Sequence, residues 1–127
     1  MENEIARDVV DAALTVHKTL GPGLLESAYE VCLAHELRLR DHDVRVQEAL
    51  PLTYKGVRVE QGYRLDMLVD GKVVIELKAV DKITDIHRAQ ILSYLRLGDF
   101  KLGFLINFNV TRLKDGIQRF ANGMPDA

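Results

Sequence analysis

Residues 66–78 read Asp-Met-Leu-Val-Asp-Gly-Lys-Val-Val-Ile-Glu-Leu-Lys, and the pattern of this stretch decides the fold. Asp70-Gly71 is a favoured two-residue turn, so the stretch predicts two antiparallel strands joined by a tight hairpin. Side chains two positions apart on a strand project from one face, so Glu76 and Lys78 point the same way. The opposite face of that strand is apolar, with Val73, Ile75, Leu77 and Ala79. This combination predicts a strand inside the sheet, with a charged pair on one side.

The charged pair needs a chemical explanation, because burying charges is costly unless they are paired or bind a ligand. Asp66, on the preceding strand, adds a second carboxylate to the pair formed by Glu76 and Lys78. Two carboxylates beside an ammonium suit metal-assisted hydrolysis of phosphodiesters, in which the acids hold a divalent cation and the lysine orients a water or the phosphate. The spacing alone is also compatible with a solvated edge strand, since most charged residues lie at the surface.

The composition of the 127 residues, 47% hydrophobic and 28% charged, predicts one globular domain spanning residues 1–127. The chain has no apolar run long enough to span a membrane, no secretory start and a single cysteine, so we expect a cytoplasmic protein without a disulfide. The net charge of −2 argues against tight nonspecific binding of nucleic acid. However, residues 1–43 carry 4 − 9 = −5 and residues 44–127 carry 13 − 10 = +3, so a polyanion could approach the second part.

The periodicity of the apolar residues predicts the order of helices and strands. Helical spacing predicts helices over residues 3–19, about 24–40 and 84–97. The short Gly-Pro-Gly break between the first two predicts an N-terminal helical hairpin. Period-two patterns predict strands within residues 44–54, 61–69, 72–80 and 101–108, and Asp115-Gly116 predicts the turn of a short hairpin in the tail. A helix between two apolar strands predicts an α/β fold with a mixed sheet flanked by helices.

Two further places could contribute polar groups to the same site. Gln90 and Tyr94 are four residues apart and therefore share one face of their helix. If that helix packs beside the Glu76 strand, Gln90 could bond the lysine or a metal-bound water, and Tyr94 could reach a phosphate or a base. An ordinary exposed polar stripe explains them equally well. Glu26 opens the second helix, where a carboxylate interacts well with the helix dipole, or it is a third acid of the site.

Five short motifs, taken together, resemble the GxxExxY family of small prokaryotic proteins. They are Gly23-x-x-Glu26-x-x-Tyr29, Tyr54-Lys-Gly, Glu76-Leu-Lys-Ala-Val, His87-x-x-Gln90-x-x-x-Tyr94 and Leu105-Ile-Asn-Phe. That family is similar to the PD-(D/E)XK nuclease superfamily. The resemblance implies a restriction-endonuclease-like fold, with a mixed four-stranded sheet between helices.

The resemblance also implies roles for individual residues. Lys78 would be the signature lysine, and Gln90 with Tyr94 would match the Gln-x-x-x-Tyr element of the RecB-like branch. The implied ligands of a Mg²⁺ or Mn²⁺ ion are Asp66, Glu76, Glu26 and the backbone carbonyl of Leu77. The catalytic set implied is Lys78, Glu76, Asp66, Gln90 and Tyr94. The proline that commonly precedes the first acid is replaced by Leu65, and the cysteines of the iron–sulfur members are missing.

These observations predict a metal-dependent nuclease that hydrolyses DNA, or alternatively RNA. A first alternative is a non-catalytic module with a nuclease-like fold that binds nucleic acid or a partner protein. A second alternative is a structural protein in which the charged cluster is an internal salt-bridge network. With no separate recognition domain in the sequence, we expect target choice to come from the core fold, from a homodimer or from a partner protein.

Overall fold

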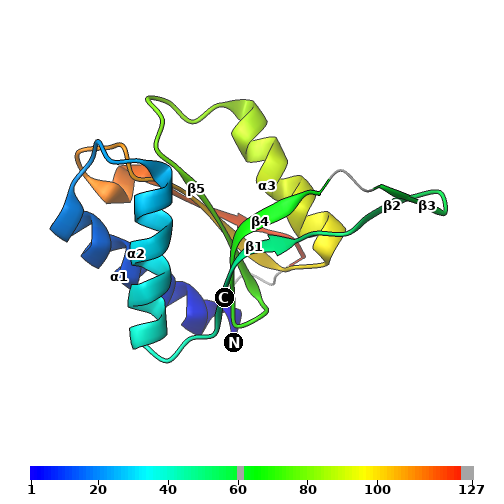
Figure 1. The fold of residues 1–127 in the computed structure, drawn as a ribbon, viewed down its shortest axis with the longest axis horizontal. Coiled ribbons are helices and arrows are strands. Elements are labelled where there is room, and N and C mark those ends of the chain that lie inside the picture. Colours follow the sequence, from blue (N-terminus) through cyan, green and yellow to red (C-terminus); the bar gives the residue numbers. More distant parts are fainter. Residues whose placement is uncertain (60–61, 124–127) are drawn as a thin grey trace.

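The computed structural model describes residues 1–59 and 62–123, and it consists of a five-stranded mixed sheet with helices on both faces (Figure 1). The sheet has the order β1-β4-β5-β6-β7, with bounds Val44–Ala49, Arg64–Val69, Val73–Lys78, Leu102–Asn107 and Ile117–Ala121. The helices are α1 (Glu2–Leu20), α2 (Glu26–Leu39) and α3 (Asp85–Gly98). The predicted α/β class, the mixed sheet and the helical hairpin of α1 and α2 are confirmed, with five strands in place of four.

Strand β5 lies in the middle of the sheet, antiparallel to β4 and parallel to β6. Helix α3 makes the crossover between the two parallel strands, as the sequence order predicts. All of β5 from Val73 to Leu77 is buried. The alternative of a solvated edge strand is therefore wrong: the acid and the lysine belong to the central strand.

The two faces of the sheet pack against different helices. Helices α1 and α2 cover the face that carries Val73, Ile75 and Leu77, and they bury Val9, Ala13 and Leu33 against it. Helix α3 covers the other face, where Ile91 and Leu95 pack with Val74 and Leu105. Because Glu76 and Lys78 alternate with the apolar row of β5, they point to the α3 side and remain between the two helical layers at the end of the strand.

The tail differs from the sequence prediction. Asp115-Gly116 lies in a 3₁₀ helix, η1 (Leu113–Gly116), and the strand that follows it pairs antiparallel with β6. The predicted short hairpin within the tail is wrong, because β7 finds its partner in the sheet and not in its sequence neighbour. A side chain at Gly116 would place a Cβ atom 2.2 Å from the Asn107 carbonyl oxygen, so the close approach requires glycine. In the central hairpin, β4 begins at Arg64, and Gln61 lies outside the described residues.

A second, two-stranded sheet projects from the body of the molecule (Figure 1). It is the hairpin of β2 (Leu52–Tyr54) and β3 (Val57–Val59), which we call the arm. Its turn places Lys55 and Gly56 at φ values of 47° and 83°. Two positive φ values in a two-residue loop are those of a type I′ turn. No helix in the described ranges is long and apolar enough to cross a membrane.

Candidate active site

Strands β4 and β5 separate at Asp66 and Glu76. The regular backbone pairing of the hairpin ends with Met67 opposite Ile75. Beyond that pair, carboxylates replace backbone carbonyls as the acceptors. The Asp66 amide donates to Glu76 Oε2 at 2.8 Å, and the Leu77 amide donates to Asp66 Oδ2 at 2.8 Å. The opening between the strands is therefore held by side chains, and it brings the two predicted acids together.

Glu76 is almost fully buried, with 4% of its surface exposed. Burial, and after it the nearby charge of Asp66, raise the pKa of its carboxyl, whereas the bond from the Asp66 amide and the charge of Lys78 lower it; the net result is a pKa of about 8. Asp66 is half-buried. Two acids this close repel each other when both are ionised, so the pair favours a proton or a cation between them.

Lys78 ends β5 and is half-buried. Its positive charge lowers the pKa of both Glu76 and Glu26, so it lies in the same electrostatic neighbourhood as the acids. Within the part of the chain that the structure describes, no carboxylate oxygen lies within 4.0 Å of its ammonium nitrogen, and no ion pair holds it. The ammonium is thus free to bond a water or a phosphate oxygen.

Helix α2 contributes two acids one turn apart, Glu26 and Glu30. Burial raises the pKa of both carboxyls, and the charge of Asp66 raises them further. Glu30 Oε2 accepts a hydrogen bond from Gln47 Nε2 at 3.0 Å. Our reading of the sequence missed Glu30, although its position four residues after Glu26 puts it on the same helix face. Glu26 lies near Asp66 and Lys78, as the sequence predicts for a site residue.

Gln47 lies on β1 opposite Asp66, between the pairs formed by Val46 with Met67 and by Glu48 with Leu65. Its φ of 50° is rare for a residue other than glycine, asparagine or aspartate, and it interrupts the strand at this point. The Arg64 guanidinium donates to the Gln47 carbonyl oxygen at 3.3 Å. The kink turns the Gln47 side chain toward α2, where it donates the hydrogen bond that holds Glu30.

Helix α3 brings Tyr94 to the acids. Tyr94 is 7% exposed, and burial raises its pKa, with further increases from Glu76 and Asp66. Gln90 is exposed and acts to lower the pKa of the Tyr94 hydroxyl, and the Tyr63 ring meets the Tyr94 ring edge-on at 6.5 Å. The interpretation of both residues as an exposed stripe is wrong for Tyr94, because the helix turns it into the layer that also buries Ile91 and Leu95.

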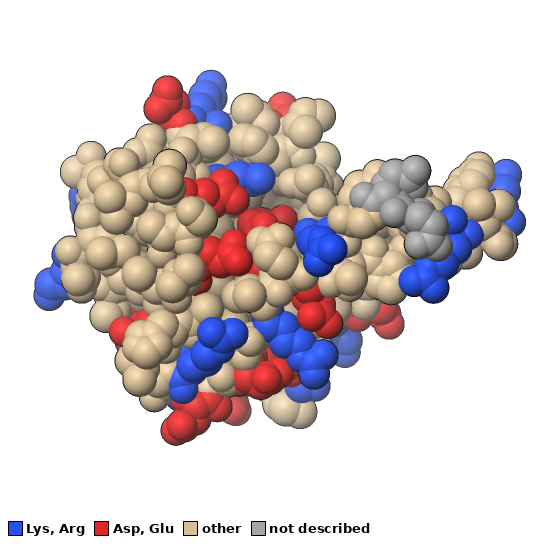
Figure 2. Space-filling view, in the orientation of Figure 1, with Lys and Arg blue, Asp and Glu red and all other residues tan. Residues whose placement is uncertain are grey.

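The charged side chains gather over the middle of the molecule. Figure 2 shows acidic side chains beside a hollow between the part formed by α1 and α2 and the part formed by α3, with basic side chains at its border. In residues 1–59 and 62–123, no three His, Cys, Asp or Glu side chains converge closely enough to hold one ion. The structure thus brings Asp66 and Glu76 together and places Glu26 nearby, without a closed cage of three acids.

A family model of the PD-(D/E)XK nuclease superfamily matches residues 3–120. The chain belongs to this superfamily. Its members generally use divalent metal ions, and a nuclease superfamily implies binding of nucleic acid. The PD-(D/E)XK match confirms the predicted superfamily, whereas assignment to the GxxExxY group stays a prediction. No curated protein and no solved structure matches the chain significantly.

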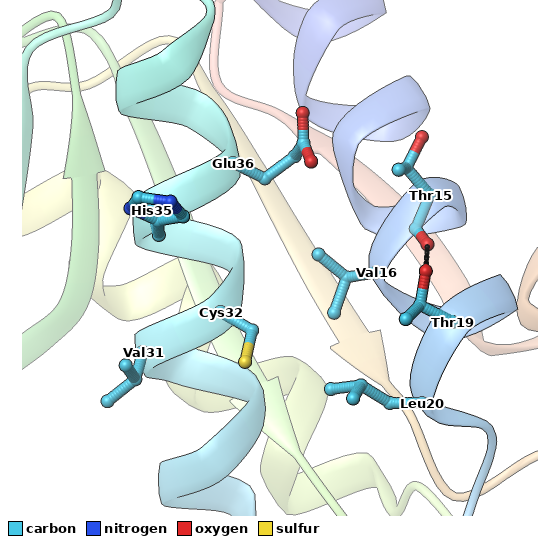
Figure 3. A pocket seen from close by; sticks show the side chains of 8 residues that line it. All are labelled: Thr15, Val16, Thr19, Leu20, Val31, Cys32, His35 and Glu36. Carbon is cyan, nitrogen blue, oxygen red and sulfur yellow. Dashed lines mark hydrogen bonds between the residues drawn. The ribbon is translucent and has the colours of Figure 1, made fainter.

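A separate groove of about 290 Å³ lies between α1 and α2 (Figure 3). It is lined by Thr15, Val16, Thr19, Leu20, Val31, Cys32, His35 and Glu36. None of the candidate site residues lines this groove, and its walls are mainly apolar. This groove belongs to the packing of the helical hairpin and is distinct from the PD-(D/E)XK site.

Proposed function

We propose that this PD-(D/E)XK protein is a divalent-metal-dependent nuclease that hydrolyses phosphodiester bonds in DNA. The observation that carries the proposal is the opening between β4 and β5, where Asp66 and Glu76 meet and Lys78 follows on the same strand face. A buried acid pair beside an unpaired ammonium has no evident role in stabilising the fold. It is, however, the set of groups that phosphodiester hydrolysis requires.

The acid pair fits Mg²⁺ or Mn²⁺. Asp66 Oδ2 and Glu76 Oε2 accept backbone hydrogen bonds, whereas no described residue donates to Asp66 Oδ1 or Glu76 Oε1. Mg²⁺ is usually held by one or two carboxylates, with waters and substrate phosphates as the other ligands, so a closed cage of acids is not needed. Glu26 and the Leu77 carbonyl are the further candidate ligands.

In the proposed mechanism, a bound metal would act as a Lewis acid and make water a better nucleophile. Asp66 and Glu76 would hold the ion, and their bonds to the sheet backbone fix the direction of both carboxylates. Lys78 Nζ donates a hydrogen bond to the attacking water or to a phosphate oxygen. Tyr94, one helical turn from Gln90, offers its hydroxyl to the phosphate or to a base at the same opening.

The test is cleavage of labelled single- and double-stranded DNA and RNA with Mg²⁺ or Mn²⁺. Lys78→Ala should lower the rate by about 100-fold or more, as loss of a group that stabilises the transition state does. Lys82→Ala, which removes an exposed lysine four residues later, is the matched control and should cut at the wild-type rate. Equal rates for wild type and Lys78→Ala would show that the lysine is not catalytic. Binding without cleavage would support the non-catalytic alternative.

One structural observation argues against the salt-bridge alternative. A network of internal salt bridges requires Lys78 to be paired, and no carboxylate among the described residues pairs with it. The choice of DNA over RNA, the cytoplasmic location, the single domain and a homodimer or partner protein stay predictions.

A further inference from the structure

The arm is a part of the chain that folding alone does not explain. No residue of β2 or β3 belongs to either hydrophobic core as far as the structure describes them. At the arm's tip, Tyr54 and Val57 face each other across the two strands and are 63% and 64% exposed. A hairpin that leaves an aromatic and a β-branched side chain uncovered at its end has a surface suited to contact with another molecule.

The turn of the arm carries a residue that its backbone disfavours. Position 55 has a φ of 47°, where hairpins of this type prefer Asn, Asp or Gly. The chain places a lysine there, and its ammonium lies 5.3 Å from the centre of the Tyr54 ring. An unfavourable backbone conformation on an exposed turn, outside both hydrophobic cores, is a pointer to function.

The charge around the arm favours a polyanion over a protein surface. Residues 50–64 contain three basic residues and one acidic residue, 3 − 1 = +2, in a chain whose net charge is −2. Figure 2 shows Lys and Arg side chains along the arm and at its junction with the body. The acids of the active site repel phosphates, so a nucleic-acid substrate needs cationic contacts elsewhere on the protein.

The arm is also close along the chain to β4, the strand that carries Asp66. The Leu50 amide donates to the Tyr63 carbonyl oxygen at 2.8 Å, and this bond joins the segments that enter and leave the arm. Tyr63 also contacts Tyr94. Val57 precedes Asp66 by nine residues, which span at most about 30 Å of extended chain. This length is shorter than one turn of duplex DNA, about 34 Å. An arm tip in contact with the duplex would therefore lie within one helical turn of the bond being cut.

We propose that the arm binds duplex DNA beside the cleavage site, with Lys55 on a phosphate and the Tyr54–Val57 pair against the groove. The major groove of B-form DNA admits a two-stranded β-ribbon, and the arm has this form. The inference rests on the proposed nuclease function, for which it names the substrate as double-stranded DNA. It assigns Lys55 and Tyr54 to substrate binding and leaves catalysis to the opening between β4 and β5.

The experiment measures binding of a labelled DNA duplex about three helical turns long by fluorescence anisotropy at several salt concentrations. Lys55→Asn keeps a residue that the turn accepts and removes the charge, so the fold should be at least as stable as wild type. We expect a several-fold loss of affinity. The slope of log K against the logarithm of the salt concentration should become shallower by about one. Lys55→Arg should bind like wild type. Lys18→Asn, which removes the same charge from an exposed position on α1, is the control.

The outcomes separate this inference from the proposed function. If wild type cuts duplex DNA but Lys55→Asn binds with wild-type affinity and salt dependence, the arm has no role in binding and only the inference fails. If Lys55→Asn instead changes the oligomeric state, the arm is a contact between protein chains and the inference is overturned. If wild type neither binds nor cuts any nucleic acid, the proposed function itself fails.

Discussion

The amide nitrogen of Asp66 lies 2.8 Å from Glu76 Oε2, and through this bond the backbone of one strand fixes the acid of the next. The reciprocal bond, from the Leu77 amide to Asp66 Oδ2, has the same length. Both carboxylates are therefore positioned by the sheet backbone, as the proposed metal site requires. The consequence for the metal-free protein is repulsion between two acids, one of them almost completely buried.

The buried acid should make the metal-free protein less stable as the pH rises. The pKa of Glu76 is about 8 in the fold, above the ordinary value of 4.5, so between these values the folded chain holds a proton that the unfolded chain has lost. The free energy of unfolding therefore falls with rising pH across this range. Glu76→Gln cannot ionise and can still accept a bond from the Asp66 amide, so its stability should depend less on pH. Urea unfolding in EDTA at pH 5 and pH 8 measures the difference.

The control for this prediction is Glu48→Gln, the same chemical change on β1, where the carboxylate pairs with Arg45 at 3.5 Å and not with the acid pair. It should follow the wild-type pH dependence. If the proposed metal site is correct, Mn²⁺ should stabilise wild type, and Glu76→Gln should lose both this stabilisation and metal-dependent cleavage. Parallel stability curves for wild type and Glu76→Gln would mean that the carboxyl of Glu76 ionises normally, and the electrostatic description of the site would be wrong.

Tyr29 holds the loop that precedes Glu26. Its hydroxyl donates to the Gly21 carbonyl oxygen at 2.6 Å and accepts from the Leu24 amide at 3.1 Å, and its ring stacks on Phe108 at 4.5 Å. Tyr29→Phe keeps the stacking but removes both bonds to the loop before Glu26, so we expect a loss of about 1–2 kcal/mol in the free energy of unfolding. Tyr54→Phe, on the exposed arm, should leave the stability unchanged. Equal losses in the two variants would exclude this role for the Tyr29 hydroxyl.

Asn107 joins the ends of β5 and β6 beyond Lys78. It is buried, its Oδ1 accepts from the amides of Val80 and Asn109 at 3.1 Å each, and its Nδ2 donates to the Val80 carbonyl oxygen at 2.9 Å. Asn107→Leu has nearly the same size but leaves these backbone groups without a partner, which should cost about 2–4 kcal/mol. Urea unfolding measures the cost, and Asn3→Leu, which removes only an exposed hydrogen bond from Arg119 to α1, serves as the control. A loss below about 1 kcal/mol would show that water replaces the side chain.

The sequence predicted the features that depend on neighbouring residues. The Asp70-Gly71 turn is confirmed, with φ values of 53° and 66°, because those two residue types favour this conformation wherever they occur. The helices follow from apolar periodicity and from the Gly-Pro-Gly break. Glu76 and Lys78 stood out because they alternate with Ile75 and Leu77 on β5, a pattern visible within six residues.

What the sequence did not predict depends on contacts between distant segments. Glu30 is held by Gln47, which is 17 residues away and has a backbone conformation that no local pattern of that strand indicates. Asn107 lies in the short motif Leu105-Ile-Asn-Phe, but its bonds to Val80 cross 27 residues. The sequence predicted strand character up to residue 54 but not the arm, because local patterns show which residues form strands and not that a ribbon leaves the sheet.

His42 offers the last test, at the other end of the sheet. Its Nδ1 lies 2.6 Å from Asp70 Oδ2 and its Nε2 lies 2.6 Å from Asp8 Oδ2, so it links α1 to the turn between β4 and β5. Burial lowers its pKa, but the bonds to Asp70 and Asp8 outweigh burial and the pKa is raised above 6.5. The protonated imidazole therefore stabilises the fold fully below the unfolded value and loses this effect as the pH rises through the folded one.

The prediction is that His42→Gln destabilises the protein more at pH 6 than at pH 9, and that added salt reduces the difference because Asp8 is half-exposed. His35→Gln, an exposed position on α2, should behave like wild type at both pH values. The effect can be separated from that of Glu76, because both lower the stability as the pH rises but over different ranges. Glu76→Gln should change the slope of the free energy of unfolding against pH from about pH 4.5 upward. His42→Gln should leave this slope unchanged until about pH 6.5. If His42→Gln changes the slope only below pH 6, the imidazole is neutral in the fold and its two contacts are ordinary hydrogen bonds.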